Sequence, residues 1–195
     1  MIRGVHAALA LAVASWVLAA CAPVAAGTAP ASVPALVPMR NAGYEDAPRG
    51  GERCAQHWDC TMHADPGAFR FRLESTAPAA GQRSLCIERI KPEPWALATQ
   101  AIDIGALHGK RLRFSIAVRA EALDGRGAGP WIQMHGVPAA QGHVERLVTR
   151  TDGWQRVAVE FTVFPAATLL EVGAVLEGGG RACLDEARLE VLEAE

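Results

Sequence analysis

The stretch RLRFSIAVRA, residues 111–120, decides the fold class of this 195-residue chain. Its apolar side chains fall on every second position: Leu112, Phe114, Ile116 and Val118. The positions between them are mainly charged or polar: Arg111, Arg113, Ser115 and Arg119. Because successive side chains of a β-strand point to opposite faces, this period of two predicts a strand with one buried face.

The same period recurs from residue 68 onward. Further apolar alternation or short apolar runs cover residues 68–74, 84–90, 100–104, 130–134, 155–163, 169–176 and 182–192. Turn signals such as Asp152-Gly153 and Gly178-Gly179-Gly180 separate these segments. About eight strands without a long helical window predict an all-β domain, an antiparallel β-sandwich (jelly roll) over residues 41–195.

The composition excludes two broad classes of protein. The chain has 19 basic and 21 acidic residues, which gives a formal net charge of -2 and no basic stripe. A general nucleic-acid binder would carry such a stripe, so no nucleic-acid partner is expected. The apolar fraction of 50% excludes a wholly disordered chain.

Residues 1–20, MIRGVHAALALAVASWVLAA, have the pattern of a secretory signal. Arg3 precedes an apolar run that ends in small residues, and this run is short for a membrane-spanning helix. Leu18-Ala19-Ala20-Cys21 resembles the lipobox of bacterial lipoproteins. The resemblance implies that Cys21 is acylated, becomes the first residue of the mature protein and anchors it in a lipid membrane. Ordinary cleavage after Ala20, with Cys21 left as a spare thiol, is the alternative.

Residues 21–40 are predicted to form a tether between the lipidated cysteine and the domain. Residues 22–40 carry four of the twelve prolines, and Pro/Ala-rich spacers are extended and semi-rigid. The expected location is the bacterial cell envelope, with the protein anchored to the outer membrane and facing the periplasm.

The remaining four cysteines suit an oxidising compartment, in which an even number indicates a disulfide framework with three possible pairings. We expect Cys54 to pair with Cys60 across a short loop, and Cys86 to pair with Cys183 between two predicted strands. Zinc is the alternative at the first pair, because Cys54, His57, Cys60 and His63 follow the spacing C-x2-H-x2-C-x2-H.

Several stretches together resemble a bacterial jelly-roll domain of the galactose-binding-like kind, which is shared by many carbohydrate-binding modules. The stretches that carry this resemblance are Asn41-Ala42-Gly43-Tyr44-Glu45, Gly81-Gln82-Arg83-Ser84-Leu85, Gln100-Ala101-Ile102, residues 107–115, Gly153-Trp154 and residues 178–185. The resemblance covers residues 41–192. It implies that Glu45 and Asp185 hold a structural calcium, although no cofactor is required by any other feature. A capping role for Asp185 and a solvated Glu45 are the alternative.

A sugar-binding face needs aromatic platforms flanked by polar groups, because the apolar faces of sugar rings stack on aromatic rings. Period-two alternation places Trp131, Gln133 and His135 on one side of a strand, and Trp95 lies in a proline-bounded segment that could line the rim. We expect these four residues to contact a ligand if one binds. Core or edge packing is the alternative for each tryptophan.

The chain has neither a G-x-S-x-G nucleophile elbow nor an H-E-x-x-H zinc helix, so no enzymatic activity is expected. The sequence therefore predicts a non-catalytic envelope lipoprotein whose domain binds a glycan or another small envelope component. The alternative is a structural module that docks an envelope protein. An exposed Trp131 ring in a groove would favour the first hypothesis, and a buried ring would favour the second.

Overall fold

The computed structural model describes residues 34–50, 54–121, 123–137, 143–144 and 147–192; for the two-residue strand at 143–144 the backbone alone is described. Its regular elements are eleven strands: β1 (Ala35–Val37), β2 (Asp59–Met62), β3 (Phe69–Glu74), β4 (Ser84–Arg89), β5 (Trp95–Ile102), β6 (Arg111–Glu121), β7 (Gly127–His135), β8 (His143–Val144), β9 (Gln155–Thr162), β10 (Leu169–Glu177) and β11 (Arg181–Val191). The predicted all-β class is confirmed. Within this described part, no helix is long and apolar enough to cross a membrane.

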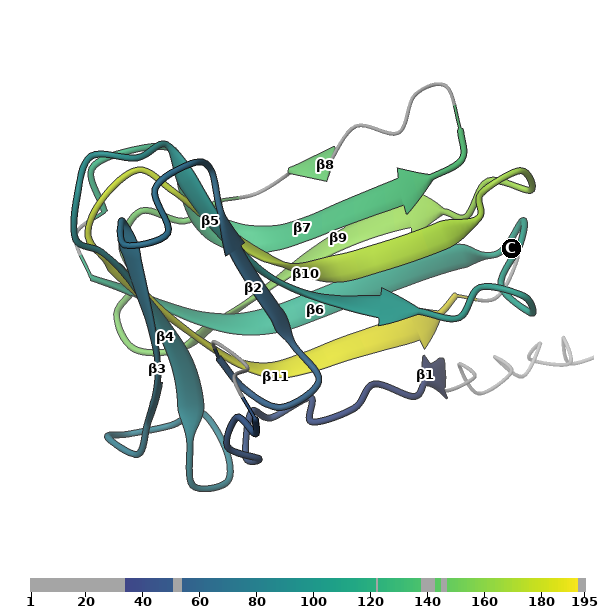
Figure 1. Ribbon diagram of the computed structural model, residues 1–195. Coiled ribbons are helices and arrows are strands. Elements are labelled where there is room, and N and C mark those ends of the chain that lie inside the picture. Colours follow the sequence, from purple (N-terminus) through teal and green to yellow (C-terminus); the bar gives the residue numbers. More distant parts are fainter. Residues whose placement is uncertain (1–33, 51–53, 122, 138–142, 145–146, 193–195) are drawn as a thin grey trace, which may run out of the picture. The chain divides into compact units, whose positions relative to one another are not determined.

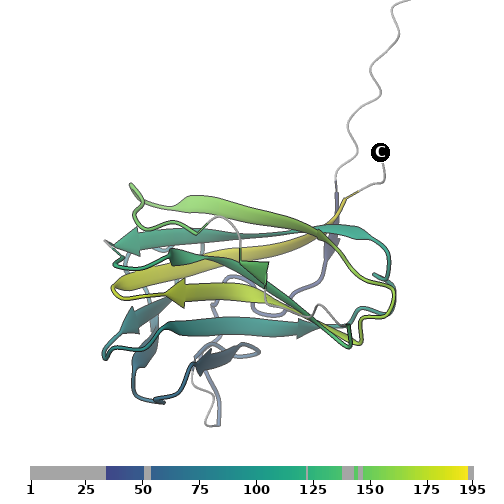
Figure 2. The same ribbon diagram turned by 90° about the horizontal axis from the view of Figure 1, so that it is seen from above.

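The strands form two antiparallel sheets that stack as a sandwich (Figures 1 and 2). One sheet has the order β3-β4-β11-β6-β9, with β1 paired to the far half of β11. The other has the order β2-β5-β10-β7-β8. Except for β3-β4 and β7-β8, neighbours in each sheet are not consecutive in sequence, as is usual for jelly rolls, so most residues that meet on one face come from distant segments.

The core lies between the two sheets and is built from the alternating faces that the sequence shows. Leu112, Phe114, Ile116 and Val118 of β6 are completely buried. They meet the inward side chains of β10, which include Leu170, Val172, Ala174 and Leu176. Full burial of one such aliphatic or aromatic side chain stabilises the fold by about 1.5–3 kcal/mol. The opposite face of each strand is thereby free to carry polar residues.

Both predicted disulfides are confirmed. Cys54 and Cys60 are joined, and so are Cys86 and Cys183, which lie directly opposite each other on β4 and β11. The Cys54–Cys60 disulfide uses both thiols that the zinc alternative needs, so that alternative is wrong in this structure.

The sandwich extends beyond the expected start at residue 41. Ala35–Val37 pair with Leu189–Val191, and the backbone of Arg40 is bonded to the side chain of Gln100. The end of the predicted tether is therefore part of the sheet. The predicted signal peptide and Cys21 lie outside the described residues.

Candidate functional site

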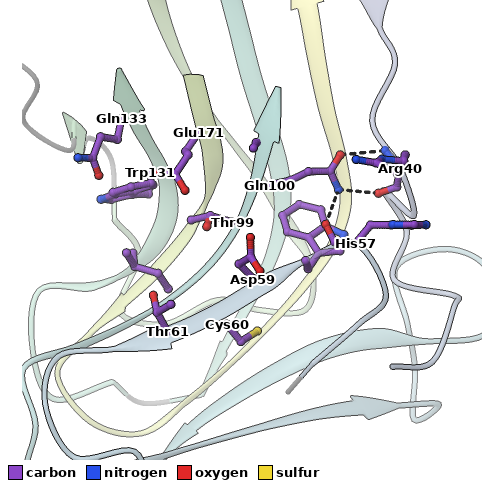
Figure 3. Close-up of a pocket in the computed structure, with 13 residues that line it drawn as sticks. Arg40, His57, Asp59, Cys60, Thr61, Thr99, Gln100, Trp131, Gln133 and Glu171 are labelled. Carbon is purple, nitrogen blue, oxygen red and sulfur yellow. Dashed lines mark hydrogen bonds between the residues drawn. The ribbon is translucent and has the colours of Figure 1, made fainter. Parts of the chain in front are cut away.

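A cavity of about 720 Å³ lies on the outer face of the five-stranded sheet (Figure 3). We call it the sheet-face cavity. The strands β2, β5, β10 and β7 supply most of its lining, and Arg40, His57 and Trp58 close one side. Its lining residues are Arg40, His57, Trp58, Asp59, Cys60, Thr61, Leu97, Thr99, Gln100, Ala101, Trp131, Gln133 and Glu171.

The strand register aligns one residue from each of β2, β5, β10 and β7 in a row across the sheet. Asp59 lies opposite Thr99, Thr99 lies opposite Gly173, and Gly173 lies opposite Trp131. Residues that face each other across adjacent strands point to the same side of a sheet. With strands about 4.8 Å apart, the row spans about 14 Å from the backbone of Asp59 to that of Trp131. This row forms the floor of the cavity.

Gly173 has no side chain, which leaves a gap in the middle of this floor. A Cβ atom at this position would lie 2.0 Å from the backbone oxygen of Ala98 and 2.7 Å from the Cα atom of Thr99. No side chain therefore fits at Gly173 without moving β5. The resulting gap between Thr99 and Trp131 gives a ligand access to the sheet itself.

Several polar side chains point into the cavity without a partner. In the part of the chain that the structure describes, no hydrogen bond or ion pair involves the side chains of Asp59, Thr61, Thr99 or Gln133. Thr99 is only 5% exposed, so its hydroxyl can reach solvent only through the cavity. Buried polar groups normally have a hydrogen-bond partner, so the buried Thr99 hydroxyl in particular has free capacity for a ligand, and the more exposed side chains of Asp59, Thr61 and Gln133 are also available.

Trp131 and Gln133 line the cavity as predicted, but the Trp131 residue is only 8% exposed. The tryptophan is therefore an edge of the cavity wall rather than an open platform. An exposed ring in a groove would have favoured glycan binding, and a buried ring would have favoured a protein partner. The observed ring lies in a groove but is mostly buried, so it falls between these two outcomes. A ligand can reach only a small part of the ring.

His135 acts on the cavity through a neighbour. Its Nε2 atom lies 2.7 Å from the Oε2 atom of Glu171, and Glu171 lines the cavity opposite Gln133. Although His135 is on the same side of β7 as Trp131 and Gln133, it does not itself line the cavity. It orients one of the cavity's two carboxylates.

The structure does not bring Trp95 to this cavity. Trp95 is the first residue of β5 rather than part of a loop, and its ring lies edge-on to His63, with ring centroids 5.7 Å apart. His63 in turn contacts Glu93, with 2.9 Å between the Nδ1 and Oε2 atoms. This aromatic pair belongs to the end of the five-stranded sheet at which β5 begins.

Gln100 positions the wall of the cavity. Its Oε1 atom accepts a hydrogen bond of 2.9 Å from the backbone of Arg40, and its Nε2 atom donates to the carbonyls of Arg40 and His57. The glutamine is nearly buried, so these bonds hold segments that are 60 and 43 residues away in sequence. No sequence signal indicated this role, because it depends on a contact between distant segments.

The Cys54–Cys60 disulfide fixes the start of β2. Cys60 lines the cavity next to Asp59, and Cys54 also lies against the carbonyl of Trp58, with its sulfur 3.4 Å away. Trp58 is buried, and its Nε1 atom donates to the carbonyl of Asn41. The short covalent loop thus holds both the wall and the polar row in place.

Asp185, expected at the calcium site, is completely buried and accepts backbone hydrogen bonds instead. Its Oδ2 atom accepts from Ala79 and Ala80, and its Oδ1 atom accepts from Glu186. Burial raises the pKa of the Asp185 carboxyl above its usual value, although these three bonds act in the opposite direction. Burial and the nearby Asp185 charge also raise the pKa of the buried Tyr44 hydroxyl well above its usual value.

Glu45 holds the same loop. Its Oε1 atom accepts hydrogen bonds from the backbones of Gln82 and Arg83, while the Arg83 guanidinium donates to the Glu45 carbonyl. Calcium requires six to eight oxygen ligands, whereas the groups described around these two carboxylates are mainly N–H donors. No cluster of three metal-binding side chains occurs among the described residues. These N–H groups cannot act as calcium ligands, so the surroundings of Glu45 and Asp185 do not fit a calcium site, and we assign no role to that ion.

We compared the chain with known proteins. No family profile matches the sequence, and no curated protein matches it. Solved structures do match. The CBM22-1 xylan-binding domain from Paenibacillus barcinonensis Xyn10C superposes with a TM-score of 0.55 and 13% identity, over 78% of this chain and 93% of that domain. TmCBM61, solved in complex with beta-1,4-galactotriose, gives a TM-score of 0.53 and 15% identity over 79% of this chain and 97% of that one.

The fold is the β jelly roll of the carbohydrate-binding modules. At these identities the likeness establishes the architecture alone. A carbohydrate-binding-module fold provides two sheet faces, and the described cavity with Trp131 and free polar groups lies on the five-stranded one.

Proposed function

We propose that this domain binds an oligosaccharide across the sheet-face cavity, without chemical change to the sugar. One observation carries the proposal: Asp59, Thr99 and Gln133 present unpartnered polar groups in a cavity that is also lined by Trp131. Sugars offer hydroxyl groups for hydrogen bonds and apolar ring faces for aromatic contact, which matches this combination. The solved neighbours support it, since they include a xylan-binding domain and a module in complex with a galactotriose.

The test is isothermal titration calorimetry of the purified domain with xylan, galactan and glucan oligosaccharides. Gln133→Ala removes one free amide from a half-buried position, and we expect it to weaken binding by about 1 kcal/mol, or about fivefold in Kd. Trp131→Ala should also weaken binding, and Trp154→Ala is its matched control, because Trp154 directly precedes β9 of the other sheet and lies against Arg119. Failure of every glycan in this panel to bind would overturn the proposal.

A protein partner is the second candidate function, and the small exposed fraction of Trp131 favours it. A sugar stacks best on an open aromatic face, whereas this residue is 8% exposed. A protein loop could instead use the free polar groups of the row for hydrogen bonds. Capture of an envelope protein that depends on Gln133, together with no response in the calorimetric panel, would support this function over glycan binding.

We also propose that the protein is a lipoprotein of the bacterial envelope, anchored through acylated Cys21 and held on the periplasmic side of the outer membrane. Two or three acyl chains on one residue anchor firmly, whereas a single chain binds reversibly. Metabolic labelling with a fatty acid should mark the wild type, and Cys21→Ser should remove the label and release the protein from membranes. A labelled serine variant would contradict the proposal.

A further inference from the structure

Asp59 is an exposed carboxylate in the floor of the sheet-face cavity. It lies opposite Thr99 on β5, in the row that continues through Gly173 to Trp131. No cationic side chain neutralises it within the described residues. Elsewhere on the domain, exposed carboxylates such as Asp65 and Glu160 have a lysine or arginine partner. Asp59 is therefore an unpaired charge inside the candidate site, next to the buried hydroxyl of Thr99.

The cavity is lined by charged groups of both signs, and by the imidazole of His57. Asp59 and Glu171 supply two carboxylates, and Arg40 is the one guanidinium among the described lining residues. In Figure 3, Asp59 lies between Trp131 and Arg40, and Arg40 is at the end of the cavity farthest from the tryptophan. The part of the floor nearest to Trp131 thus holds Glu171, which is paired with His135, while the unpaired Asp59 lies at the other end of the row.

The neighbouring groups show how a ligand would meet Asp59. Thr99 is more than nine-tenths buried, and its unpartnered hydroxyl lines the cavity in the position next to Asp59. Gly173 leaves the floor open between Thr99 and Trp131. A chain of sugar rings that crosses the strands can therefore contact Trp131 with one ring and Thr99 and Asp59 with substituents farther along.

We propose that the glycan bound in this cavity carries free amino groups, and that an ammonium group of an amino sugar pairs with Asp59. This inference rests on the proposed glycan-binding function and names the chemical class of its ligand. An ammonium donates charge-assisted hydrogen bonds to a carboxylate, and these are about twice as strong as bonds between neutral groups. Trp131 and Gln133 contact the sugar in either case, so the amino group determines selectivity rather than binding as such.

The experiment compares β-1,4-linked hexamers that differ at one substituent. Glucosamine and glucose hexamers carry an amino group and a hydroxyl group, respectively, at the same carbon. A uronic-acid oligosaccharide serves as the anionic probe. Binding is measured by calorimetry at about pH 5, because the neighbouring oxygens make a sugar amine less basic than a lysine amine and a lower pH keeps it protonated. The variants are Asp59→Asn and the matched control Glu88→Gln, which removes a carboxylate from the other sheet, where it pairs with Arg70.

We expect the wild type to bind the glucosamine hexamer at least about tenfold more tightly than the glucose hexamer. Added salt should reduce this preference, because screening weakens exposed charge pairs. Asp59→Asn should remove the preference for the glucosamine hexamer over the glucose hexamer, while Glu88→Gln should retain it. Circular dichroism checks that both variants are folded.

Two results would overturn the inference and leave glycan binding intact: a preference that survives Asp59→Asn, or tighter binding of the neutral or the anionic oligosaccharide. Weaker binding of both hexamers by Gln133→Ala would still support the proposed function in that case. A wild type that binds no hexamer and no other glycan would overturn both.

Discussion

Asp185 is a single buried carboxylate that holds two distant segments of the chain together. Its two oxygens accept hydrogen bonds from three backbone N–H groups, of which two belong to a loop more than one hundred residues earlier in the chain. It lies at the irregularity of β11, where Glu186 has a φ of 47° and the pairing with β6 shifts. The carboxylate thus connects a bulge in one strand to the loop between β3 and β4.

Replacement of Asp185 by asparagine tests this connection. The amide has one oxygen, so its NH2 group must face at least one backbone donor, and we expect the free energy of unfolding to fall by about 2 kcal/mol at pH 7. Because burial raises the pKa of the wild-type carboxyl in the folded state, its stabilising contribution is greatest at low pH and is lost as the pH rises. The difference between wild type and Asp185→Asn should therefore widen between pH 7 and pH 4.

Urea unfolding at both pH values measures this difference. A difference that narrows on acidification would mean that the three N–H bonds outweigh burial, and that the folded state favours the ionised carboxylate. Asp152→Asn, at an exposed turn position, is the control for loss of a carboxylate as such.

Of the individual residues in the candidate site, the sequence identified only some. Alternation along β7 was sufficient to place Trp131 and Gln133 on one face, because that pattern is local. Asp59, Thr99 and Glu171 were missed, since they meet only through the pairing of β2, β5 and β10. Strand pairing depends on the whole sheet, and a single sequence does not encode it in any short pattern.

Among the elements, long alternating strands were predicted well and short ones were missed. The predicted segments 111–120, 155–163 and 182–192 correspond to β6, β9 and β11 within two residues at each end. In contrast, β1, β2 and β8 have two to four residues each, too few to show a period. β5 begins at Trp95 rather than residue 100, because Pro92 and Pro94 indicated a loop and its Ala-rich start showed no clear alternation.

The loop between β3 and β4 is held by hydrogen bonds from its backbone to two carboxylates. Asp185 holds Ala79 and Ala80, and Glu45 holds Gln82 and Arg83. The Glu45 carboxylate lies so close to Gly81 that a Cβ atom there would be 1.9 Å from its Oε1 atom. We therefore expect the melting temperature to be the same in excess EDTA and in millimolar calcium chloride, as measured by differential scanning calorimetry. An increase of several degrees in calcium alone would revive the calcium hypothesis.

The Cys54–Cys60 loop should contribute to binding as well as to stability. It closes only six residues, for which the chain-entropy argument gives about 2 kcal/mol. It also fixes Asp59 and the wall of the cavity, so a double Cys54→Ala, Cys60→Ala variant should bind glycan at least about tenfold more weakly. Calorimetry measures affinity, and urea unfolding measures stability. Unchanged affinity in a folded variant would show that β2 is positioned by its pairing with β5 alone.

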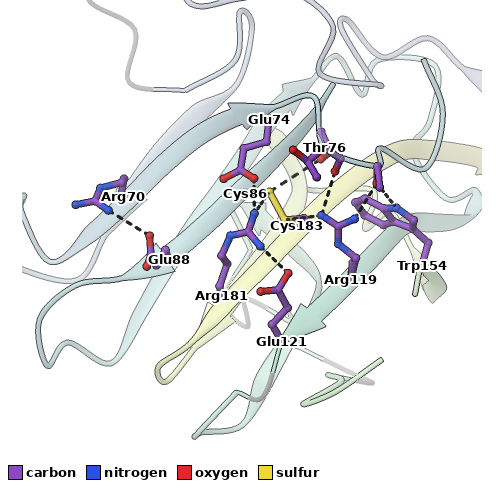
Figure 4. Close-up of polar contacts among 12 residues, drawn as sticks. Arg70, Glu74, Thr76, Cys86, Glu88, Arg119, Glu121, Trp154, Arg181 and Cys183 are labelled. Atoms are coloured by element: carbon purple, nitrogen blue, oxygen red, sulfur yellow. Dashed lines mark hydrogen bonds and ion pairs between the residues drawn. A yellow bond between two sulfur atoms is a disulfide. The ribbon is translucent and has the colours of Figure 1, made fainter. Parts of the chain in front are cut away.

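On the scale of the whole molecule, the two outer faces of the sandwich have different characters. The five-stranded sheet carries the cavity with its unpartnered groups, whereas the six-stranded sheet is covered by paired charges (Figure 4). There Arg181 contacts both Glu74 and Glu121, and Arg119 lies over the Trp154 ring, 5.0 Å from its centroid. A face on which most charges are paired offers a ligand few free groups, which supports the proposed site on the other face.

The Cys86–Cys183 disulfide lies within this second face, and it should contribute to stability without affecting binding. It joins residues 97 apart in sequence, and the chain-entropy argument gives about 4–5 kcal/mol for a loop of that length. Arg119 and Arg181 each lie against one of its sulfurs, on the side of the molecule away from the cavity. A double Cys86→Ala, Cys183→Ala variant should therefore unfold at much lower urea concentration, yet bind glycan with wild-type affinity while it remains folded. The Cys54, Cys60 variant should thus lose both affinity and stability, whereas the Cys86, Cys183 variant should lose stability alone. Equal effects of both on affinity would mean that the sandwich responds as one body, and that the cavity depends on global stability rather than on its own wall.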